Sequence, residues 1–540
     1  MLFHTWTFFL FFILTLVGFW ALRPTRYWLH WILLSSAVFY GWWHPYYLLL
    51  VFYSTALDFF IVNWMERGSR LAKLGWRFGV SCGGVVASVV GVFFVLKEEA
   101  PSVLEVWMRF RYTILGHGEQ LGWGGLLGAI GFLSLVLAVG HFLRSRRAWL
   151  VVSITNNLSV LFFFKYAGFA IENLNNLLAQ IGVGQLASAE SLMPPGWEYV
   201  LPVGISFYTF QSMSYTFDFY RGVIPREPSF VRFAAFVTFF PQLVAGPIER
   251  AKTLLPQFAK FPRIEWGDVT DGASLFLVGL FKKVALANYL GPYVDRVYGD
   301  VETQGGATLA LATFAFGWQI YFDFSGYTDM ARGVARCMGF RLMLNFRNPY
   351  LAVSLADFWS RWHISLSTWF RDYVYIPLGG SRVGSLKLWR NLLITFVVSG
   401  LWHGAAWTFL IWGALHGLGL IANRGLEQVA WWRDCCPRLA KRLVVFAFVC
   451  FAWVFFRAES LGQAMEILQR IFTTGWADPQ MPLLLLLLVV SVWVYQFVYE
   501  SPLRGWLEKS PVKVALAVAM ILWMLLFAPG GGEPFIYFQF

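Results

Sequence analysis

The chain contains little charge. Only 13% of its 540 residues are Asp, Glu, Lys or Arg, against roughly 25% in an ordinary soluble domain. At the same time 58% of the residues are hydrophobic. A soluble fold of this length has no core large enough to bury so much apolar surface, whereas a lipid bilayer accepts it. The composition therefore excludes an ordinary soluble enzyme and predicts an integral membrane protein.

Cysteine is scarce, and the signature of a cleavable leader is not found at the start of the sequence. The cysteines show no metal-ligand spacing, so we expect neither a disulfide framework nor a metal site. Their positions are Cys82, Cys337, Cys435, Cys436 and Cys450. The start of the chain has no basic region, and no small-residue cleavage site follows the first apolar run. We therefore expect that run, 6–22, to remain in the membrane as a span.

A nucleic-acid-binding signature is missing as well. The net charge is +12, but no basic tail or RNA-type motif accompanies it, so we expect no nucleic-acid partner. The loops at 23–26, 67–77 and 144–147 are basic, whereas the loop around 44–45 has no Lys or Arg. Because basic loops favour the cytoplasm, this alternation places the N-terminus outside it. An even number of spans then places the C-terminus outside as well.

Long apolar runs dominate the rest of the chain, and about 20 such residues cross the hydrocarbon core of a bilayer. We predict spans at 6–22, 27–43, 46–64, 76–96, 121–143, 148–164, 199–220, 272–296, 307–330, 390–423 (a pair), 443–457, 483–499 and 513–528. The expected fold class is all-α, a polytopic membrane protein of about 11–14 transmembrane helices. We interpret the polar stretches 165–198 and 249–271 as loops within a single membrane domain that covers residues 1–540.

Two stretches differ from ordinary spans. Segment 230–248 is apolar but contains Pro241 and Pro247, and proline breaks helices. We expect it to be re-entrant or interfacial on the cytoplasmic side. Segment 351–380 carries several charged residues among large apolar ones. Irregular or charged backbone at membrane depth persists only where protein or a water-filled cavity surrounds it, so this half of the chain is expected to build a cavity.

Two of the eight histidines lie within small-residue motifs. His403 and His416 each precede the second glycine of a GxxxG, a spacing that lets another helix approach closely. An ionisable group inside a membrane domain is a functional candidate by default. The alternative for each is a packing histidine that hydrogen-bonds a neighbouring carbonyl. The segment 390–423 is too long for one straight span, roughly 50 Å at 1.5 Å per residue, so we predict a break near Gly404.

Further candidates lie between residues 355 and 390. Asp357 and Arg361 are spaced i,i+4 and can pair on one helix face, either as a structural ion pair or as part of a binding site. His363 can position or polarise a reacting group, or anchor a neighbour. A basic set follows at Arg371, Arg382, Lys387 and Arg390. It is either positive-inside charge or a phosphate-binding mouth for a nucleotide-like donor such as coenzyme A.

Several runs of residues resemble the membrane-bound O-acyltransferase (MBOAT) family. The runs are Phe240-Pro241-Gln242-Leu243-Val244-Ala245-Gly246-Pro247-Ile248, Tyr321-Phe322-Asp323-Phe324-Ser325-Gly326-Tyr327, Arg361-Trp362-His363-Ile364-Ser365-Leu366-Ser367 and Trp402-His403-Gly404-Ala405. They occur in the family's order and cover most of the chain. The sequence is most similar to the membrane subunit of bacterial alginate O-acetylation, and more weakly to the D-alanyl transfer protein of teichoic acid modification.

The resemblance implies an enzyme of the bacterial inner membrane. It makes His403 the family's key histidine and His363 its second polar position. It implies acetyl-CoA as the cytoplasmic donor substrate, no tightly bound cofactor and no metal. The acyl group would pass through a central tunnel to an extracytoplasmic polysaccharide or to an acetyl-transferring partner protein. Ala406 and Ser360 depart from the usual pattern, where Asn and a basic residue are common, and leave the substrate open.

The chemistry fits these residues. Acyl transfer from a thioester to a hydroxyl needs a base, and a neutral imidazole is suited to that role. No G-x-S-x-G motif accompanies the histidines, so a covalent serine enzyme is not expected. The alternatives are a transporter or flippase of a cell-envelope pathway without acyl chemistry, and a scaffold for exopolysaccharide export. A transporter often has inverted repeats, and no repeat stands out in this sequence.

Overall fold

The structure is a computed structural model that describes residues 1–43, 47–67, 145–182, 184, 186–192, 199–477, 480–527 and 535. The predicted spans 76–96 and 121–143 lie outside these residues, as does Cys82. Every regular element in the described part of the chain is a helix, which confirms the all-α prediction.

Several helices are suited to a bilayer by length and composition. Within the described residues, five are long and apolar enough to cross it: Tyr47–Glu66, Arg146–Gln180, Trp266–Tyr298, Arg438–Arg457 and Ser510–Phe527. Two shorter apolar helices, Trp6–Leu22 and Leu483–Tyr499, have the bounds predicted for spans 6–22 and 483–499. The chain is therefore a polytopic membrane protein, as its composition indicates.

The chain forms two compact units. The first contains Met1, 11–244 and 249–262. Its helices after α1 (Trp6–Leu22) are α2 (Trp28–Gly41), α3 (Tyr47–Arg67), α7 (Arg146–Leu161), η2 (Phe162–Tyr166), α8 (Ala167–Gln180), η3 (Ala189–Leu192), α9 (Ile205–Tyr220), α10 (Phe230–Thr238), α11 (Phe240–Leu243) and α12 (Ala251–Phe258). Helices α3, α7 and α9 pack on one another, and α10 packs on α2 and α3.

A buried carboxylate joins three helices of this first unit. Asp58 of α3 has no exposed surface. It accepts hydrogen bonds from the Ser153 hydroxyl of α7 at 2.5 Å, from the Ser212 hydroxyl of α9 at 2.5 Å and from the Asn157 amide of α7 at 3.0 Å. Three donors compensate for the removal of this carboxylate from water, which is the usual condition for burying one.

Two predictions for the first unit have different outcomes. Segment 230–248 is broken, since α10 ends at Thr238 and α11 begins at Phe240, while its re-entrant or interfacial placement stays a prediction. The prediction of loops at 165–198 and 249–271 is wrong in part, because 167–180 forms helix α8 and 251–258 forms helix α12. In the first of these segments apolar residues recur at steps of three and four, from Ile171 to Leu174 and Leu178, which is the helical period.

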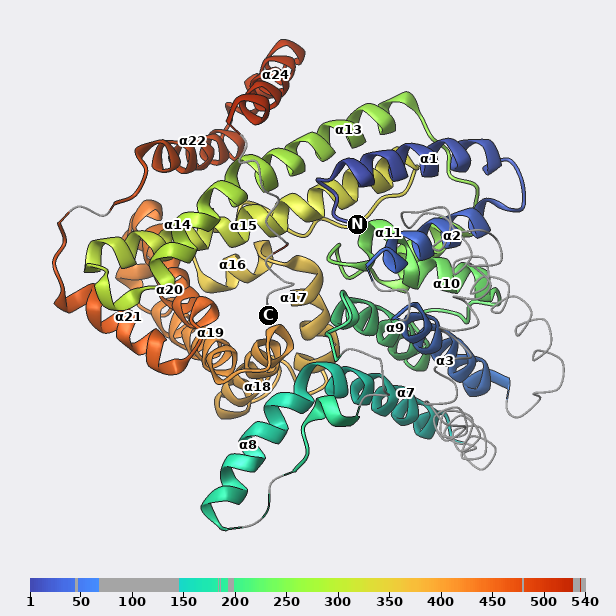
Figure 1. Cartoon of the computed structure of the whole chain (residues 1–540), viewed down its shortest axis with the longest axis horizontal. Coiled ribbons are helices and arrows are strands. Elements are labelled where there is room, and N and C mark those ends of the chain that lie inside the picture. The colour runs from blue at the N-terminus through green and yellow to red at the C-terminus, as the bar shows by residue number, and fades with distance from the viewer. Residues whose placement is uncertain are drawn as a thin grey trace. The chain divides into compact units, whose positions relative to one another are not determined.

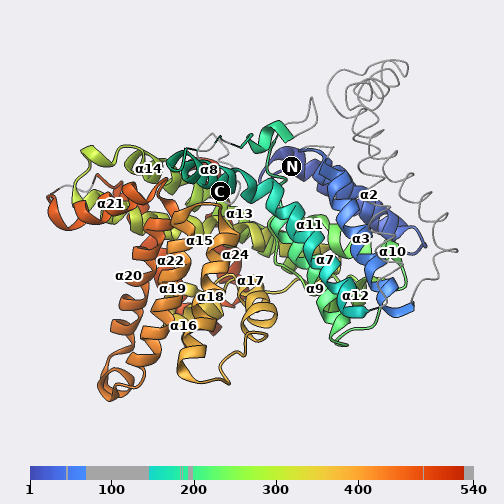
Figure 2. The same ribbon diagram turned by 90° about the horizontal axis from the view of Figure 1, so that it is seen from below.

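The second unit contains Leu2–Leu10, Ala245–Ile248 and Arg263–Phe540. Its helices are α13 (Trp266–Phe281), η4 (Lys282–Ala287), α14 (Asn288–Tyr298), η5 (Val301–Thr303), α15 (Gly306–Cys337), η6 (Pro349–Leu351), α16 (Leu355–Arg361), α17 (Ile364–Phe370), η7 (Arg371–Tyr375), α18 (Ser385–His403), α19 (Trp407–Leu426), η8 (Trp431–Cys435), α20 (Arg438–Arg457), α21 (Leu461–Thr473), α22 (Leu483–Tyr499), α23 (Arg504–Leu507) and α24 (Ser510–Phe527). Helix α13 runs along α15 (Figure 1), and α19 packs between α18 and α20 (Figure 2).

Ion pairs connect the π-helical turn η4 to the long helix α15. The Lys283 ammonium lies 2.8 Å from the Asp323 carboxylate, and both side chains are less than 5% exposed. The neighbouring Lys282 lies 2.7 Å from Asp329. Each cation therefore has its anion on the adjacent helix, and the pairs fix α15 against η4.

The contact between α18 and α19 is unusually close. A Cβ atom added to Gly400 of α18 would lie 2.1 Å from the Phe409 carbonyl oxygen, and one added to Gly413 of α19 would lie 2.2 Å from the Phe396 carbonyl oxygen. The GxxxG prediction is thus confirmed. The predicted break near Gly404 is confirmed too, since α18 ends at His403 and α19 begins at Trp407.

This contact predicts the effect of one methyl group. In Gly413→Ala the new Cβ meets backbone that cannot move aside alone, and overpacking of this kind costs about 1–3 kcal/mol. We expect a lower thermal unfolding temperature in detergent and loss of activity. The matched control is Gly425→Ala near the end of α19, where a Cβ meets nothing within 4 Å. Because alanine has the higher helix propensity, that variant should unfold at the same temperature or above. Equal unfolding temperatures for both variants would contradict the role of the glycine contact.

Candidate active site

His363 lies at a break between two short helices. Helix α16 ends at Arg361 and α17 begins at Ile364, so Asp357 and Arg361 share one short helix while His363 lies beyond its end. His363 itself has φ 42° and ψ 54°, in the left-handed region that non-glycine residues rarely occupy. Such conformations persist where the surroundings hold them, and they are frequent at functional sites.

Asn345 holds the chain on the far side of this break. Its carbonyl oxygen accepts from the Ile364 N–H at 2.9 Å. Its side-chain Oδ1 accepts from the Ser365 N–H at 3.1 Å and from the Ser365 hydroxyl at 2.9 Å. Asn345 is 1% exposed. These three bonds satisfy donors at the start of α17 and thereby fix the backbone that directly follows His363.

His403 is the last residue of α18, next to the tight contact with α19. The imidazole is 3% exposed. Its ring lies 5.0 Å from the Trp402 ring, 5.0 Å from the Trp412 ring and 5.3 Å from the Phe456 ring, measured between centroids. Helices α18, α19 and α20 thus each contribute a wall, and a histidine at a helix break inside the bundle is what the sequence predicts.

The two imidazoles lie side by side. Their ring centroids are 6.4 Å apart, and His363 has no exposed surface. Phe324 at 4.6 Å and Phe346 at 6.3 Å cover the remaining sides of the His363 ring. This spacing allows one polar group of a substrate to reach both rings, since hydrogen bonds span about 3 Å. The aromatic walls exclude bulk water from that position.

Burial decides the charge of His363. The residue lies outside the candidate spans, and burial lowers the pKa of its imidazole below the ordinary value. The ring is therefore neutral at physiological pH. A neutral imidazole offers one nitrogen that accepts a proton and one that donates a hydrogen bond, which is the form needed for base catalysis or for positioning a hydroxyl.

His416 is buried but belongs to a different contact. The Trp359 indole N–H donates to its Nδ1 at 3.3 Å. Because Nδ1 accepts, a neutral His416 carries its proton on Nε2. The ring lies 4.8 Å from Trp412, which in turn contacts His403. Trp412 thus lies between His416 and the two paired histidines.

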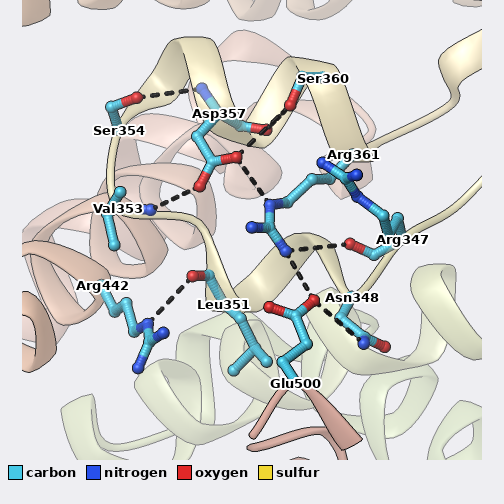
Figure 3. A network of polar contacts seen from close by, with 10 residues as sticks. All are labelled: Arg347, Asn348, Leu351, Val353, Ser354, Asp357, Ser360, Arg361, Arg442 and Glu500. Carbon is cyan, nitrogen blue, oxygen red and sulfur yellow. Dashed lines mark hydrogen bonds and ion pairs between the residues drawn. The ribbon is translucent and has the colours of Figure 1, made fainter.

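Asp357 and Arg361 belong to a network of polar contacts at the end of α16 (Figure 3). The predicted i,i+4 pair is present, with Arg361 Nε 2.7 Å from Asp357 Oδ1. Arg361 also pairs with Glu500 at 2.7 Å, and Glu500 accepts from the Asn348 amide at 3.2 Å. Burial opposes the charge of Arg361, but the bond to Asp357 and the charges of both carboxylates outweigh it and raise its pKa. The network anchors the segment that leads directly to His363.

The basic set predicted to bind the donor is spread over three elements: Arg371 begins η7, Arg382 lies in the loop before α18, and Lys387 and Arg390 lie in the first turns of α18. Arg371 is 59% exposed and pairs with the adjacent Asp372 at 2.8 Å. Arg382 and Lys387 are exposed, and Arg390 donates to Asn391 at 3.0 Å. Lys387 and His403 are 16 residues apart on α18, roughly 24 Å at 1.5 Å per residue. Lys387 and Arg390 therefore lie in the first turns of α18, and His403 ends the same helix.

Some residues of the site carry no signal in the sequence. Asn345 lies in a segment without helical period, and Glu500 is 139 residues from Arg361 in the sequence. In the sequence, nothing distinguishes Trp412 from the other aromatic residues of its apolar helix. Only the fold brings these residues to the histidines, whereas Asp357 and Arg361 were detectable because they share a helical turn.

Together these features define a class of protein: a polytopic membrane protein whose helices enclose two neighbouring imidazoles at a helix break. The family model for MBOAT, the membrane-bound O-acyltransferases, matches residues 147–462, and the chain belongs to this family. It is therefore an O-acyltransferase.

The chain is similar to three members of the family with different named activities. The chain is 41% identical to a probable alginate O-acetylase of Azotobacter vinelandii over 68% of its own length and 74% of the relative's. It is 30% identical to a peptidoglycan O-acetyltransferase of Helicobacter pylori over 73% of its length and 83% of the relative's. It is 31% identical to a teichoic acid D-alanyltransferase of Streptococcus thermophilus over 41% of its length and 56% of the relative's.

The network at α16 predicts a structural role that separates it from donor binding. Glu500→Gln removes the negative charge that faces Arg361 and keeps the shape of the side chain. Loss of one partner of a partly buried ion pair destabilises the fold more than loss of an exposed ion pair does. We expect a lower thermal unfolding temperature, a reduced turnover number and an unchanged KM for the acyl donor. Glu508→Gln is the control, because Glu508 pairs with the exposed Arg504. A raised donor KM with unchanged thermal stability would instead place the network in the donor site.

Proposed function

We propose that this enzyme takes an acetyl group from acetyl-CoA at the cytoplasmic face of the bacterial inner membrane. The group passes through the membrane domain toward an extracytoplasmic polysaccharide or an acetyl-transferring partner protein. The observation that carries the proposal is the pair of buried imidazoles 6.4 Å apart, His403 at the end of α18 and His363 between α16 and α17. The O-acetylase relatives support acetyl as the group and a polymer as the final acceptor. Both chain termini lie outside the cytoplasm in this proposal, as the loop charges predict.

In this proposal His403 is the general base. It takes the proton of the acceptor's hydroxyl or thiol group as that group attacks the acyl carbon, and it returns the proton to the departing thiolate of the donor. His363 positions the attacking group or polarises the acyl carbonyl from the other side. The aromatic walls keep water away from the thioester, which limits hydrolysis.

The histidines supply the main test. His403→Ala should nearly abolish acylation, because general base catalysis typically contributes about 10²–10⁴-fold. His363→Ala should give a comparable or smaller loss. His416→Ala should be the mildest of the three, since its Nδ1 already accepts from Trp359. The measurement is the acetyl content of the cell-surface polymer, with the amount of inserted protein determined by immunoblot.

The contrast between the variants makes this test decisive. If His403→Ala were present in normal amounts and polymer acetylation stayed near wild type, the catalytic assignment would be wrong. Unacetylated but normally exported polymer in His403→Ala would at the same time argue against the transport alternative.

The basic set supplies a separate test of the donor. The proposal places phosphate contacts among Arg371, Arg382, Lys387 and Arg390, of which Lys387 lies roughly 24 Å before His403 along α18. Neutralising a true contact to Gln should weaken acetyl-CoA binding by about 1.5–3 kcal/mol, the range for charge-assisted hydrogen bonds. Titration of the purified variants with acetyl-CoA measures this. Arg433, which pairs with Asp434 in η8, is the control cation. Unchanged acetyl-CoA affinity in all four variants would mean that these residues only set the membrane orientation of the loop, as positive-inside charges.

A further inference from the structure

The indole of Trp412 is a buried donor beside the histidine pair. The side chain has no exposed surface. Its Nε1–H finds no acceptor among the residues that the structure describes. Buried N–H groups are nearly always hydrogen-bonded in native proteins, so one without a protein acceptor indicates a missing partner. That partner must be an acceptor, since an indole N–H can only donate.

The surroundings of Trp412 leave few acceptors within the protein. Its ring lies 5.0 Å from His403, 4.8 Å from His416 and 5.3 Å from Phe456, and it lies 5.8 Å from Trp453. Neither Phe456 nor Trp453 has a side-chain atom that accepts a hydrogen bond from an N–H, because the phenyl ring is hydrocarbon and an indole nitrogen only donates. The Nδ1 acceptor of His416 is occupied by Trp359. The unsatisfied donor therefore lies in the wall that also carries the proposed base.

We propose that the Trp412 N–H binds the carbonyl oxygen of the acyl donor and stabilises the negative charge that develops there. This inference rests on the proposed function, because it needs an acyl thioester beside His403. It adds to that function the group that receives the oxyanion. A preorganised donor in a water-excluded site is the usual means of stabilising such charge.

The acceptor's oxygen forms a bond to the acyl carbon and loses its proton to His403. The π pair of the carbonyl moves onto its oxygen, which accepts the hydrogen bond from Trp412. The pair then returns, the C–S bond breaks, and the thiolate of the donor leaves with the proton from His403. Trp412 exchanges no proton in either step.

The test is Trp412→Phe, which removes the N–H and keeps an aromatic ring in the wall. Loss of one oxyanion donor typically lowers kcat about 10²–10³-fold. Because the charge exists only in the transition state, KM for acetyl-CoA should change little. Inverted membrane vesicles with radiolabelled acetyl-CoA provide the assay, with the label transferred to polymer or protein counted over time. Thermal unfolding of the purified variant reports on its folding.

The matched control is Trp453→Phe. Trp453 is 1% exposed, and its Nε1–H also lacks an acceptor among the described residues. Its recorded ring contacts include Trp362 at 5.2 Å, Phe456 at 5.1 Å and Trp412 at 5.8 Å, and none of them is with an imidazole. The control thus loses the same atoms from the same aromatic cluster, one ring further from His403, and should keep kcat within a few-fold of wild type.

The possible results distinguish a failure of the proposed Trp412 contact from a failure of the proposed acyl transfer. A large kcat loss in Trp412→Phe alone, at an unfolding temperature matching that of Trp453→Phe, supports the oxyanion contact. Equal activity in the two variants would overturn it and leave the N–H directed at a neighbouring ring face. A loss in both that follows their unfolding temperatures would also overturn it, as a packing effect. Inactive His403→Ala beside active Trp412→Phe would reject this inference while the proposed function stands.

Discussion

Backbone-to-backbone contact between α18 and α19 is the constraint on which the site depends. Two helices can touch this closely only where side chains are absent, and Gly400 and Gly413 supply those places. His403 ends the first helix and Trp412 lies on the second, 5.0 Å away between ring centroids. The close contact fixes the backbone from which each of these buried side chains projects, and a preorganised arrangement is the condition for electrostatic stabilisation without reorganisation.

The second imidazole is held by different means. His363 occupies a left-handed conformation between two helices that are each too short to be stable alone. Hydrogen bonds from the start of α17 to Asn345 hold one side, and the ion pairs of Arg361 hold the other. One histidine is thus fixed by close packing and the other by polar bonds. Changes in ionic conditions act on the second kind of support far more than on the first.

The sequence predicts much of this structure, for physical reasons that differ between elements. Long apolar runs predict helices such as Trp6–Leu22 because a bilayer fixes their length. The break after His403 and the Asp357–Arg361 pair follow from local spacing. The left-handed backbone at His363 and the contact of Arg361 with Glu500 do not, because they depend on segments far apart in the chain. Helix α8 was missed because polar residues obscure its apolar period. The prediction of a single membrane domain stays a prediction, and so do the roles of the site residues.

The two ion pairs between η4 and α15 also bear on how the protein is made. A charged side chain at the centre of a helix costs about 2.5–3.5 kcal/mol to insert into a bilayer. Lys282 and Lys283 emerge from the ribosome well before Asp323 and Asp329, the residues that neutralise them. The segment that carries Lys282 and Lys283 is therefore costly to insert into the bilayer on its own. The carboxylates that neutralise it become available only when α15 has been synthesised. Biogenesis of this region should proceed by entry of a helical hairpin, with the charges already joined, rather than by one helix after another.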